Sequence, residues 1–371
     1  MAKVMVGMSG GVDSSVTAHL LKELGFDVEG ISFMIWEARD RSKPAACCSL
    51  EAFDGAAETA RHLGITHGCV DVREDFMEKV IEPFVDQYIR GFTPNPCVLC
   101  NRHIKFPYLI READLRGAEF IATGHYAQVV RSPGPSSGNI TTGPYPQLRK
   151  GVDESKDQSY VLYGIRPEEL RRLLLPLGGY RKKDVREIAR ALGMAAAKRP
   201  ESQEICFIED NNYAAFIENL LPAAAEPGPV LNATGEVVGT HKGLYRYTIG
   251  QRKGLGIASL EPHYVTKIDG ETNSVVVGRK EDATTSEIYV HHLNWIRPPE
   301  EDHFRATVKV RSMMKDRPAS VAVSKGEARV LFDEPQWAPA PGQGAVFYDG
   351  QTVMGGGTIA EFRRPDRDKL P

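Results

Sequence analysis

Eight residues decide the fold of this chain: Gly7-Met8-Ser9-Gly10-Gly11-Val12-Asp13-Ser14. They lie between an apolar run at residues 3–6 and a helical pattern at residues 15–24. A strand, a glycine-rich turn and a helix in this order leave backbone N–H groups unpaired at the start of the helix, where the helix dipole favours negative charge. The stretch therefore predicts a phosphate-binding loop.

The residue types in this loop suit a nucleotide. Gly10 and Gly11 let the backbone approach an anion, and Ser9 and Ser14 add hydroxyl donors. The carboxylate of Asp13 can hold Mg²⁺ together with phosphate oxygens and water. No lysine follows, so the loop is neither a Gly-Lys-Ser/Thr P-loop nor a Gly-x-Gly-x-x-Gly turn. It resembles the loop of the ATP pyrophosphatase superfamily, which adenylates carbonyl oxygens; an ordinary glycine-rich turn is the alternative.

Length and composition bound the class of protein. A chain of 371 residues is too long for one core, so we expect two or three domains. The sequence has no run of about 18 apolar residues and no apolar leader, which predicts a cytoplasmic protein that does not enter a membrane. Six cysteines in a chain of this size favour catalysis or metal binding over a disulfide framework.

Charge is uneven along the chain. The net charge of −3 argues against a general attraction to nucleic acid. Residues 145–190, however, hold 11 Lys and Arg against 7 Asp and Glu, and residues 241–258 hold four basic residues and no acidic one. Such local patches can meet a phosphate backbone.

Apolar runs alternate with helical patterns in the first half of the chain. Runs at 28–36, 67–72 and 119–123 are separated by helical patterns at 49–63, 74–90 and 105–116, and a basic helical pattern follows at 181–192. This alternation predicts a parallel sheet with crossover helices. Ligands of such sheets bind at the carboxyl ends of the strands. Met34 is therefore a candidate adenine contact or a plain core residue, and Gly124-His125 belongs to the same crevice. Cys47 and Cys48 precede the first crossover pattern, where packing is their expected role.

A second informative stretch surrounds two cysteines. Pro94 and Pro96 predict a loop of fixed shape rather than a helix. Cys100 follows, with three basic residues in the next five positions and a predicted helix behind it, and such surroundings stabilise a thiolate. With Cys97 it forms a Cys-x-x-Cys, which is also half of a structural zinc site, but the chain holds no second pair.

The second half of the chain changes character. Residues 132–146, rich in Pro, Gly and Ser, predict a surface insertion, and the three prolines in residues 222–229 exclude regular structure and mark a domain boundary. Short β runs with hairpin turns at 232–235 and 269–273 follow. We expect an α/β fold with an N-terminal parallel-sheet ATP pyrophosphatase (adenine nucleotide alpha hydrolase-like) domain, a small β-rich central domain and a C-terminal β-barrel. The expected limits are 1–222, with a basic helical segment at about 150–222 that, by the family resemblance described next, contacts tRNA, then 223–285 and 286–371.

Taken together, these motifs resemble the bacterial tRNA-specific 2-thiouridylases along nearly the whole chain. Seven pieces match in the family's order: residues 7–14, Thr93-Pro94-Asn95-Pro96 with Cys100-Asn101, residues 122–126, Lys156-Asp157-Gln158-Ser159-Tyr160, Ile205-Cys206-Phe207-Ile208, residues 248–256, and Pro341-Gly342-Gln343. The resemblance implies a tRNA sulfurtransferase that uses ATP and Mg²⁺ to replace the 2-oxygen of the wobble uridine U34 with sulfur.

The resemblance also implies a mechanism. ATP adenylates the uracil C2 oxygen with release of pyrophosphate, and a persulfide on Cys206 attacks C2 and displaces AMP. Cys100 then attacks the Cys206 sulfur in the S–S bond to the base, which releases the product and leaves a Cys100–Cys206 disulfide for a reductant to open. The implied partners are tRNAs of the Lys, Glu and Gln type and a sulfur relay or cysteine desulfurase, and the protein is expected to be a monomer.

The family motifs assign further residues. Those expected at ATP are Gly7, Met8, Ser9, Gly10, Gly11, Val12, Asp13, Ser14, Met34 and Gly124. Those expected at the target base are Asn95, Pro96 and Cys97. Those expected at tRNA are His125, Lys156, Asp157, Gln158, Arg311, Ser312 and Gln343.

One departure leaves the sulfur chemistry open. Much of the family has Asp where this chain has Cys97, and a carboxylate there could act in acid–base catalysis. Here Cys97, Cys100 and Cys206 could instead hold a [4Fe-4S] cluster with one open iron. We favour the persulfide relay. A ligase that forms amide bonds, or a non-catalytic RNA-binding protein, are alternatives of another class, but the first would need an ammonia source and the second would need neither loop nor thiols.

Overall fold

The structure, a computed structural model, describes residues 1–36, 50–131, 146–198, 205–208, 212–257 and 261–360. The chain divides into two compact units. The first comprises Met1–Glu82, Pro96–Phe216 and Gln351–Val353, and the second comprises Pro83–Asn95, Ile217–Gly350 and Met354–Pro371. The cysteines Cys47 and Cys48 and the predicted insertion, apart from Pro146, lie outside the described residues.

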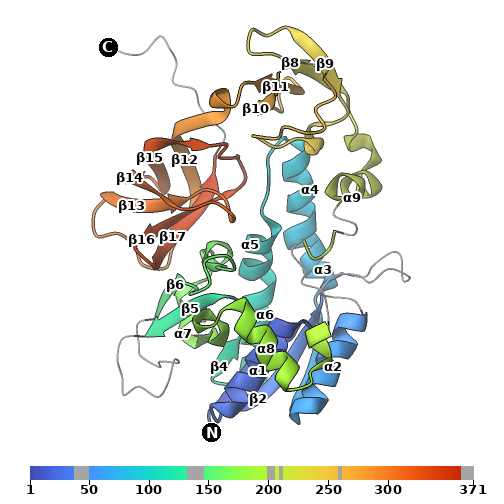
Figure 1. The fold of residues 1–371 in the computed structure, drawn as a ribbon, viewed down its shortest axis with the longest axis vertical. Helices are drawn as coiled ribbons and strands as arrows, with labels where there is room; N and C mark the ends of the chain where they lie inside the picture. The colour runs from blue at the N-terminus through green and yellow to red at the C-terminus, as the bar shows by residue number, and fades with distance from the viewer. Residues whose placement is uncertain (37–49, 132–145, 199–204, 209–211, 258–260, 361–371) are drawn as a thin grey trace. The chain divides into compact units, whose positions relative to one another are not determined.

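A parallel sheet forms the centre of the first unit (Figure 1). Its strands are β1 (Lys3–Gly7), β2 (Asp27–Met34), β3 (Thr66–Asp71), β4 (Phe120–Ala122) and β7 (Leu173–Leu174), in the order β3-β2-β1-β4-β7. Val4, Met5 and Val6 of the central strand are fully buried, as expected for a parallel strand covered on both faces. The predicted parallel sheet is confirmed.

Helices cover both faces of this sheet. On one face α1 (Val12–Glu23), α2 (Leu50–Leu63) and α8 (Lys182–Ala191) share one apolar core with Val4 and Val6. The intervening residues of β1 point the other way, and there α6 (Phe106–Leu115) brings Leu109 to 3.5 Å from the Cβ position of Gly7. The loop between β1 and α1 therefore emerges at the carboxyl end of the central strand.

The cysteine-bearing segment differs from its prediction. Instead of a loop followed by a helix at residue 105, the chain turns helical at once in α5 (Pro96–Cys100), continues through a π-helical turn (Asn101–Lys105) and runs into α6. Proline is tolerated in the first turn of a helix because its missing N–H would have no partner there. Cys97 and Cys100 consequently lie on one helix, and Cys100 is not at a helix N-terminus.

The remaining elements of this half of the chain are short. They are α3 (Arg73–Phe76), a π-helical turn (Met77–Ile81), α4 (Glu82–Ile89), the antiparallel pair β5 (Ala127–Arg131) and β6 (Pro146–Lys150), η3 (Ser159–Leu162), α7 (Pro167–Arg172), η4 (Pro176–Gly179), η5 (Ala195–Lys198) and α9 (Tyr213–Leu220). The helix predicted at 74–90 is thereby confirmed.

The second unit holds a small sheet and a closed barrel. The sheet order is β10-β11-β8-β9, with β8 (Gly228–Leu231), β9 (Val237–His241), β10 (Tyr264–Asp269) and β11 (Ser274–Gly278). Both predicted hairpin turns are confirmed, because β8 pairs antiparallel with β9 and β10 with β11. The 3-10 helices are η7 (Pro222–Ala224), η8 (Leu244–Arg246) and η9 (Glu281–Ala283).

Six strands form the barrel. They are β12 (Thr284–Trp295), β13 (His303–Lys309), β14 (Arg317–Ser324), β15 (Glu327–Trp337), β16 (Gly344–Asp349) and β17 (Thr352–Ile359), in the order β12-β15-β14-β13-β16-β17. Pairing of β12 with β17 closes the ring, and its interior is filled by Val290, Val308, Val330 and Phe347. The predicted C-terminal β-barrel is confirmed.

One prediction in this half was wrong. Residues 222–229 were expected to exclude regular structure, yet β8 begins at Gly228 and contains Pro229. Pro229 pairs with Thr240 of β9, while the pairing with β11 starts only at Val230. A proline cannot donate a ladder hydrogen bond, so the start of a strand that is still open on one side is where it is tolerated. Within the described residues, no helix is both long and apolar enough to cross a membrane.

Candidate active site

The loop between β1 and α1 has the geometry of an anion site. Gly10 has φ +70°, which a side chain would strain, and Gly11 at the N-cap of α1 leaves that helix end without a side-chain cap. The positive end of the helix dipole therefore faces the loop. Backbone amides at such an end bind phosphate.

The two serines of the loop shape it. The N–H of Ser9 donates to Ser14 Oγ at 3.1 Å, the two hydroxyl oxygens lie 3.3 Å apart, and Ser14 Oγ donates to the Gly11 carbonyl at 3.2 Å. Ser9 is exposed and Ser14 is buried. Of the two predicted hydroxyl donors, Ser9 is thus the one with access to a ligand from solvent, while Ser14 closes the turn.

The segment after β4 lies directly against this loop. A Cβ placed on Gly124 would meet the carbonyl carbon of Asp13 and the nitrogen of Ser14, both at 2.9 Å. Backbone atoms cannot move aside as a flexible side chain can, so only glycine fits here. Gly124 lies beside the loop, as its place at the end of a strand predicts. Met34, at the end of β2, is half-buried, and its contact with adenine stays a prediction.

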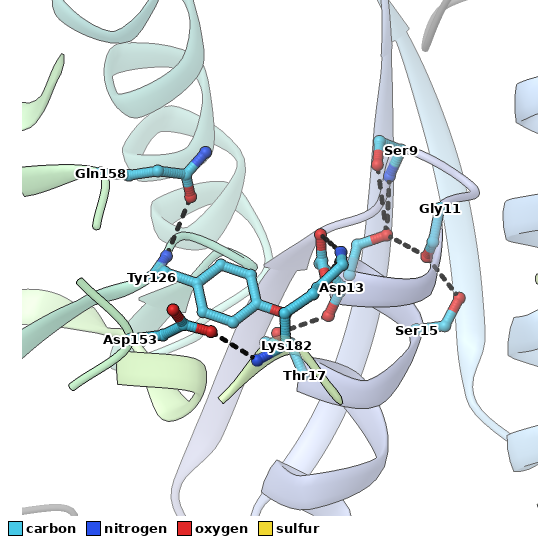
Figure 2. A network of polar contacts seen from close by, with 10 residues as sticks. Ser9, Gly11, Asp13, Ser15, Thr17, Tyr126, Asp153, Gln158 and Lys182 are labelled. Carbon is cyan, nitrogen blue, oxygen red and sulfur yellow. Dashed lines mark hydrogen bonds and ion pairs between the residues drawn. The ribbon is translucent and has the colours of Figure 1, made fainter. Parts of the chain in front are cut away.

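Two residues that the sequence did not identify hold Asp13. Tyr126 Oη donates to Asp13 Oδ1 at 2.7 Å, and Lys182 Nζ lies 2.7 Å from both Asp13 Oδ1 and Oδ2 (Figure 2). The Lys182 side chain is 11% exposed and that of Asp13 is 33% exposed. The magnesium ligand expected in the loop is therefore also the partner of a buried lysine in an ion pair.

Further contacts fix these two partners. Gln158 Oε1 accepts from the Tyr126 N–H, and Gln158 N–H donates to the Tyr126 carbonyl, both at 2.9 Å. Asp153 accepts the Lys182 N–H at 3.0 Å, and hydrogen bonds from Ser155 and Lys182 lower the pKa of Asp153. The sequence carried a signal for Lys182, because the loop lacks a lysine of its own and residues 181–192 are strongly basic. Nothing in the sequence, however, indicates that Lys182 pairs with Asp13.

His125 lies in the interior. It is 8% exposed, its Nδ1 lies 2.7 Å from Thr123 Oγ1, and its ring lies 6.2 Å from that of Phe106. Burial, with Lys105 nearby, lowers the pKa of His125 well below its usual range, so the ring is neutral at physiological pH. A contact with tRNA would require this ring to become exposed, and the prediction is not supported by its position.

The two candidate catalytic cysteines lie within electrostatic reach of each other. Cys100 ends α5, with Cys97 one turn earlier and exposed. Cys100 is half-buried, and desolvation of its thiol raises its pKa to about 12; Lys105 lowers this pKa, and Cys206 and Cys97 raise it further. The expectation of a stabilised thiolate at Cys100 was wrong, because desolvation outweighs the single effective cation.

Cys206 is held by an aromatic anchor. Its neighbour Phe207 is buried and packs edge-on against Phe76 at 5.6 Å and against Phe216 at 5.3 Å between ring centroids. Cys206 itself is half-buried and forms no disulfide in this structure. Cys206 lies more than 100 residues after Cys100 in the sequence, and the packing of Phe207 on Phe76 and Phe216 fixes its segment in the fold.

The motif at residues 156–160 braces the site from inside the first unit. Asp157 accepts the N–H groups of Gly151 and Ser159 at 3.0 and 3.1 Å, and Ser159 Oγ donates to it at 2.9 Å. Lys156 is half-buried, with its N–H on the Asp153 carbonyl. Asp157 and Gln158 thus have structural partners, and their tRNA contacts stay predictions.

The tRNA residues expected in the second unit also have partners within it. Arg311 donates to the carbonyls of Ala338 and Ile249 at 3.0 and 2.8 Å. Gln343 Nε2 lies 3.0 Å from the Thr93 carbonyl and contacts that of Pro94. The next residue after Arg311, Ser312, is exposed.

The residues expected at the target base lie at the start of α5. Asn95 is half-buried, Pro96 is buried and Cys97 is exposed. Across the described ranges, no three His, Cys, Asp or Glu side chains are grouped so that they could hold a metal ion. The cluster ligand set of Cys97, Cys100 and Cys206 is therefore not assembled in this conformation.

Known proteins are similar to this chain throughout its length. Three family models match: "tRNA methyl transferase HUP domain" over residues 2–210, "tRNA methyl transferase PRC-barrel domain" over residues 214–279 and "Aminomethyltransferase beta-barrel domain" over residues 285–359. They confirm the predicted order of domains, which is an α/β domain, then a small β domain, then a β-barrel. The limits that we expect for the three domains stay predictions.

Named relatives identify the family. The tRNA-specific 2-thiouridylase MnmA 1 of Thermoanaerobacter sp. strain X514 is 45% identical over 362 residues, which cover 96% of this chain and 97% of the relative. The tRNA-specific 2-thiouridylase MnmA of Clostridioides difficile is 43% identical, with coverage of 96% and 98%. A solved 4-thiouridine synthetase–RNA complex with bound ATP aligns more weakly, with a TM-score of 0.37 and 18% identity over 60% of this chain and 50% of that one. On the near full-length relatives, the chain belongs to the family of tRNA-specific 2-thiouridylases.

Proposed function

We propose that this protein is an ATP-dependent tRNA sulfurtransferase that converts the wobble uridine U34 to 2-thiouridine. One observation carries the chemistry: the charge of Cys206 raises the pKa of the Cys100 thiol, so these two thiols, far apart in sequence, lie near each other in the unit that holds the phosphate loop. A phosphate loop alone serves many nucleotide enzymes, and paired thiols alone serve many redox enzymes. Their combination fits activation of an oxygen followed by its replacement with sulfur.

The first step activates a poor electrophile. The uracil O2 attacks the α-phosphorus of ATP, the bond to pyrophosphate breaks, and the N3 proton leaves to solvent. The N-terminus of α1 and the hydroxyl of Ser9 are placed to stabilise negative charge on the phosphates. The C2 carbon then carries AMP as its leaving group.

The second step brings in sulfur. The terminal sulfur of a persulfide on Cys206 attacks C2, and AMP departs with the electrons of the C–O bond. Cys206 is then linked through one sulfur to the base. The aromatic anchor at Phe207 limits how far this thiol moves during the attack.

The third step releases the product. Cys100 attacks the sulfur of Cys206, the S–S bond breaks, and its electron pair goes to the sulfur that stays on C2. The base regains a proton as 2-thiouridine, and a Cys100–Cys206 disulfide remains. A dithiol reductant must reduce it before the next turnover.

Mg²⁺ fits the chemistry of the loop. Asp13 is the one carboxylate in residues 7–14, and a hard oxygen ligand that is one-third exposed is what Mg²⁺ takes from a protein when phosphates supply other ligands. When bound, the ion would neutralise charge on the phosphates and on the departing pyrophosphate. Asp13 would hold it, once its oxygens part from Lys182.

The finer assignments belong to the same proposal. The substrates are tRNAs of the Lys, Glu and Gln type, the sulfur comes from a relay protein or a cysteine desulfurase, and the enzyme acts as a monomer in the cytoplasm. Family membership supports the tRNA substrate. The exposed basic pair Arg252 and Lys253 supports contact with a phosphate backbone.

Separate readouts for each step test the proposal. Pyrophosphate release and 2-thiouridine formation are measured with unmodified tRNA and a persulfide donor. We expect Cys100→Ser and Cys206→Ser to release pyrophosphate in the first turnover without forming 2-thiouridine, and Asp13→Ala to do neither while still binding tRNA. Undiminished 2-thiouridine from both serine variants would overturn the thiol assignment, and undiminished pyrophosphate release from Asp13→Ala would overturn the role of the loop.

A further inference from the structure

The phosphate loop contains no cation of its own, yet one lies against it. Residues 7–14 include neither Lys nor Arg. Lys182, from the first turn of α8, places Nζ 2.7 Å from each carboxylate oxygen of Asp13, in the first turn of α1 (Figure 2). An ammonium group therefore lies at the helix end where phosphates bind.

Neighbouring residues hold the Lys182 side chain at this helix end. Its N–H is fixed on Asp153 at 3.0 Å, and its Nζ lies 5.5 Å from the centre of the Tyr126 ring, whose hydroxyl bonds the same carboxylate. The adjacent Lys183 is exposed, whereas Lys182 is buried. A buried ammonium needs a counter-charge, and without nucleotide Asp13 provides it.

The pairing conflicts with the other task of Asp13. Both of its oxygens are engaged by Lys182, so Mg²⁺ and the ammonium compete for one carboxylate, and moving the ammonium to another anion strengthens the hold of Asp13 on the metal. The phosphates that Mg²⁺ brings to the loop are such anions, and they lie next to the metal by coordination.

We propose that Lys182 is the cation of the phosphate loop and that, on ATP binding, its ammonium exchanges the Asp13 carboxylate for the β- and γ-phosphates. The exchange rests on the proposed use of ATP. It leaves Asp13 for Mg²⁺ and gives the loop, from a distant helix, the contact that the lysine of a P-loop makes from within.

Equilibrium binding of ATP and of AMP, measured by calorimetry with Mg²⁺ and without tRNA, tests this. We expect Lys182→Met to weaken ATP binding by about 10- to 100-fold, the range of a charge-assisted hydrogen bond, and AMP binding by less than about twofold. Lys182→Arg should keep part of the ATP affinity. Lys183→Met, the matched control on the exposed neighbour, should bind ATP like the wild type.

A double variant separates a phosphate contact from mere positioning of Asp13. In the Asp13→Asn background the ion pair is gone, so Lys182→Met should still weaken ATP binding if the ammonium touches phosphate. The double variant buries no unpaired charge, which keeps the test valid should Lys182→Met alone be unstable. An unchanged ATP affinity in that background, or equal losses for ATP and AMP, would overturn the inference alone. A wild type that binds no ATP would overturn the proposed function and this inference with it.

Discussion

Burial determines how Cys100 can react. A thiol with a pKa of about 12 is ionised in only about one molecule in 10,000 at pH 8, against about one in ten at its ordinary value. Cys100 is therefore unsuited to open the reaction as a free thiolate. It suits the last step, where a good leaving group, the sulfur of the thiolated base, departs as the thiol gives up its proton.

Alkylation measures this directly. Because a thiol gains reactivity as it loses its proton, and a raised pKa moves that loss to higher pH, labelling of Cys100 by iodoacetamide should rise about tenfold per pH unit from pH 7 to 10 without levelling off. Peptide mass spectrometry resolves the site, and the urea-unfolded chain serves as control, with levelling near pH 9. A plateau at or below pH 9 in the folded protein would show that Cys100 is not desolvated.

A substitution at Cys97 separates the two sulfur chemistries. If sulfur travels as a persulfide, Cys97→Asp should retain substantial thiolation, because only Cys100 and Cys206 carry and release the sulfur. If a cluster carries it, the variant should lose iron and thiolation together, since a carboxylate is a poorer ligand for cluster iron than a thiolate. Iron content and 2-thiouridine are measured on anaerobically prepared protein, beside Cys100→Ser and Cys206→Ser. An iron-dependent wild type that fails in all three variants would refute the relay.

Gly124 offers a test of the contact between two loops. Gly124→Ala drives a Cβ into the backbone of Asp13 and Ser14, so we expect ATP binding to fall by at least about tenfold with the fold retained. In the control Gly68→Ala, the nearest atom is the flexible end of Arg116 at 3.4 Å, which can yield. Calorimetry with ATP and circular dichroism report the two properties. Normal ATP affinity in Gly124→Ala would show that the two loops separate easily.

Among the elements, those with strong local patterns could be predicted. The alternation of apolar runs and helical patterns is enough for the parallel sheet, and glycines such as Gly25 and Gly64, both with positive φ, mark helix ends correctly. Pro96 and Pro229 misled, because a proline excludes structure only where its N–H is needed, and both lie at the start of an element. Whether a backbone N–H at a given position needs a hydrogen-bond partner depends on the folded structure. The local sequence alone does not show this.

The contacts of Gln343 indicate that it stabilises the backbone just before α5. Its amide reaches the carbonyls of Thr93 and Pro94, on the stretch that leads into α5. We expect Gln343→Ala to raise backbone hydrogen exchange in residues 91–95 by about tenfold without tRNA, while exchange in the hairpin turn at 269–273 stays unchanged. If Gln343 serves tRNA alone, exchange in the two peptides will be unaltered.

At the scale of the whole molecule, tRNA affinity should depend on salt. Counterion release lowers log affinity by about 0.9 per phosphate contact for each unit of log salt on a duplex. Arg252 and Lys253 are exposed, so replacing both with alanine should flatten that slope by about 1.8 if each meets one phosphate. Filter binding between 50 and 300 mM salt measures it, with Arg61→Ala and Lys325→Ala together, both exposed and outside the predicted tRNA-contacting segments, as a comparison of equal charge. A slope identical to the wild type would remove the pair from the interface.

The site itself could be predicted only in its motifs. The loop, Gly124 and the two cysteines are recognisable because glycine turns and paired thiols carry their chemistry in the residue type. The pairing of Asp13 with Tyr126 and Lys182 is not, since it arises where α8 and the segment after β4 meet the start of α1. Nor is the pKa of Cys100, because desolvation depends on which atoms surround the thiol and not on the basic residues that follow it.

The order of strands in the sheet has a consequence for the ribosome. The central strand β1 emerges first, but its neighbour β4 begins only at Phe120. Lys182, the partner that pairs with the Asp13 carboxylate, follows Asp13 by 169 residues. At about 5 to 20 residues per second, this partner arrives roughly 8 to 34 s later. Until then β1 lacks its full set of neighbouring strands and the Asp13 carboxylate lacks the ammonium that pairs with it. A chain stopped before Lys182 has its whole loop but lacks the ammonium that we propose for the phosphates, so it should bind ATP more weakly than the finished protein.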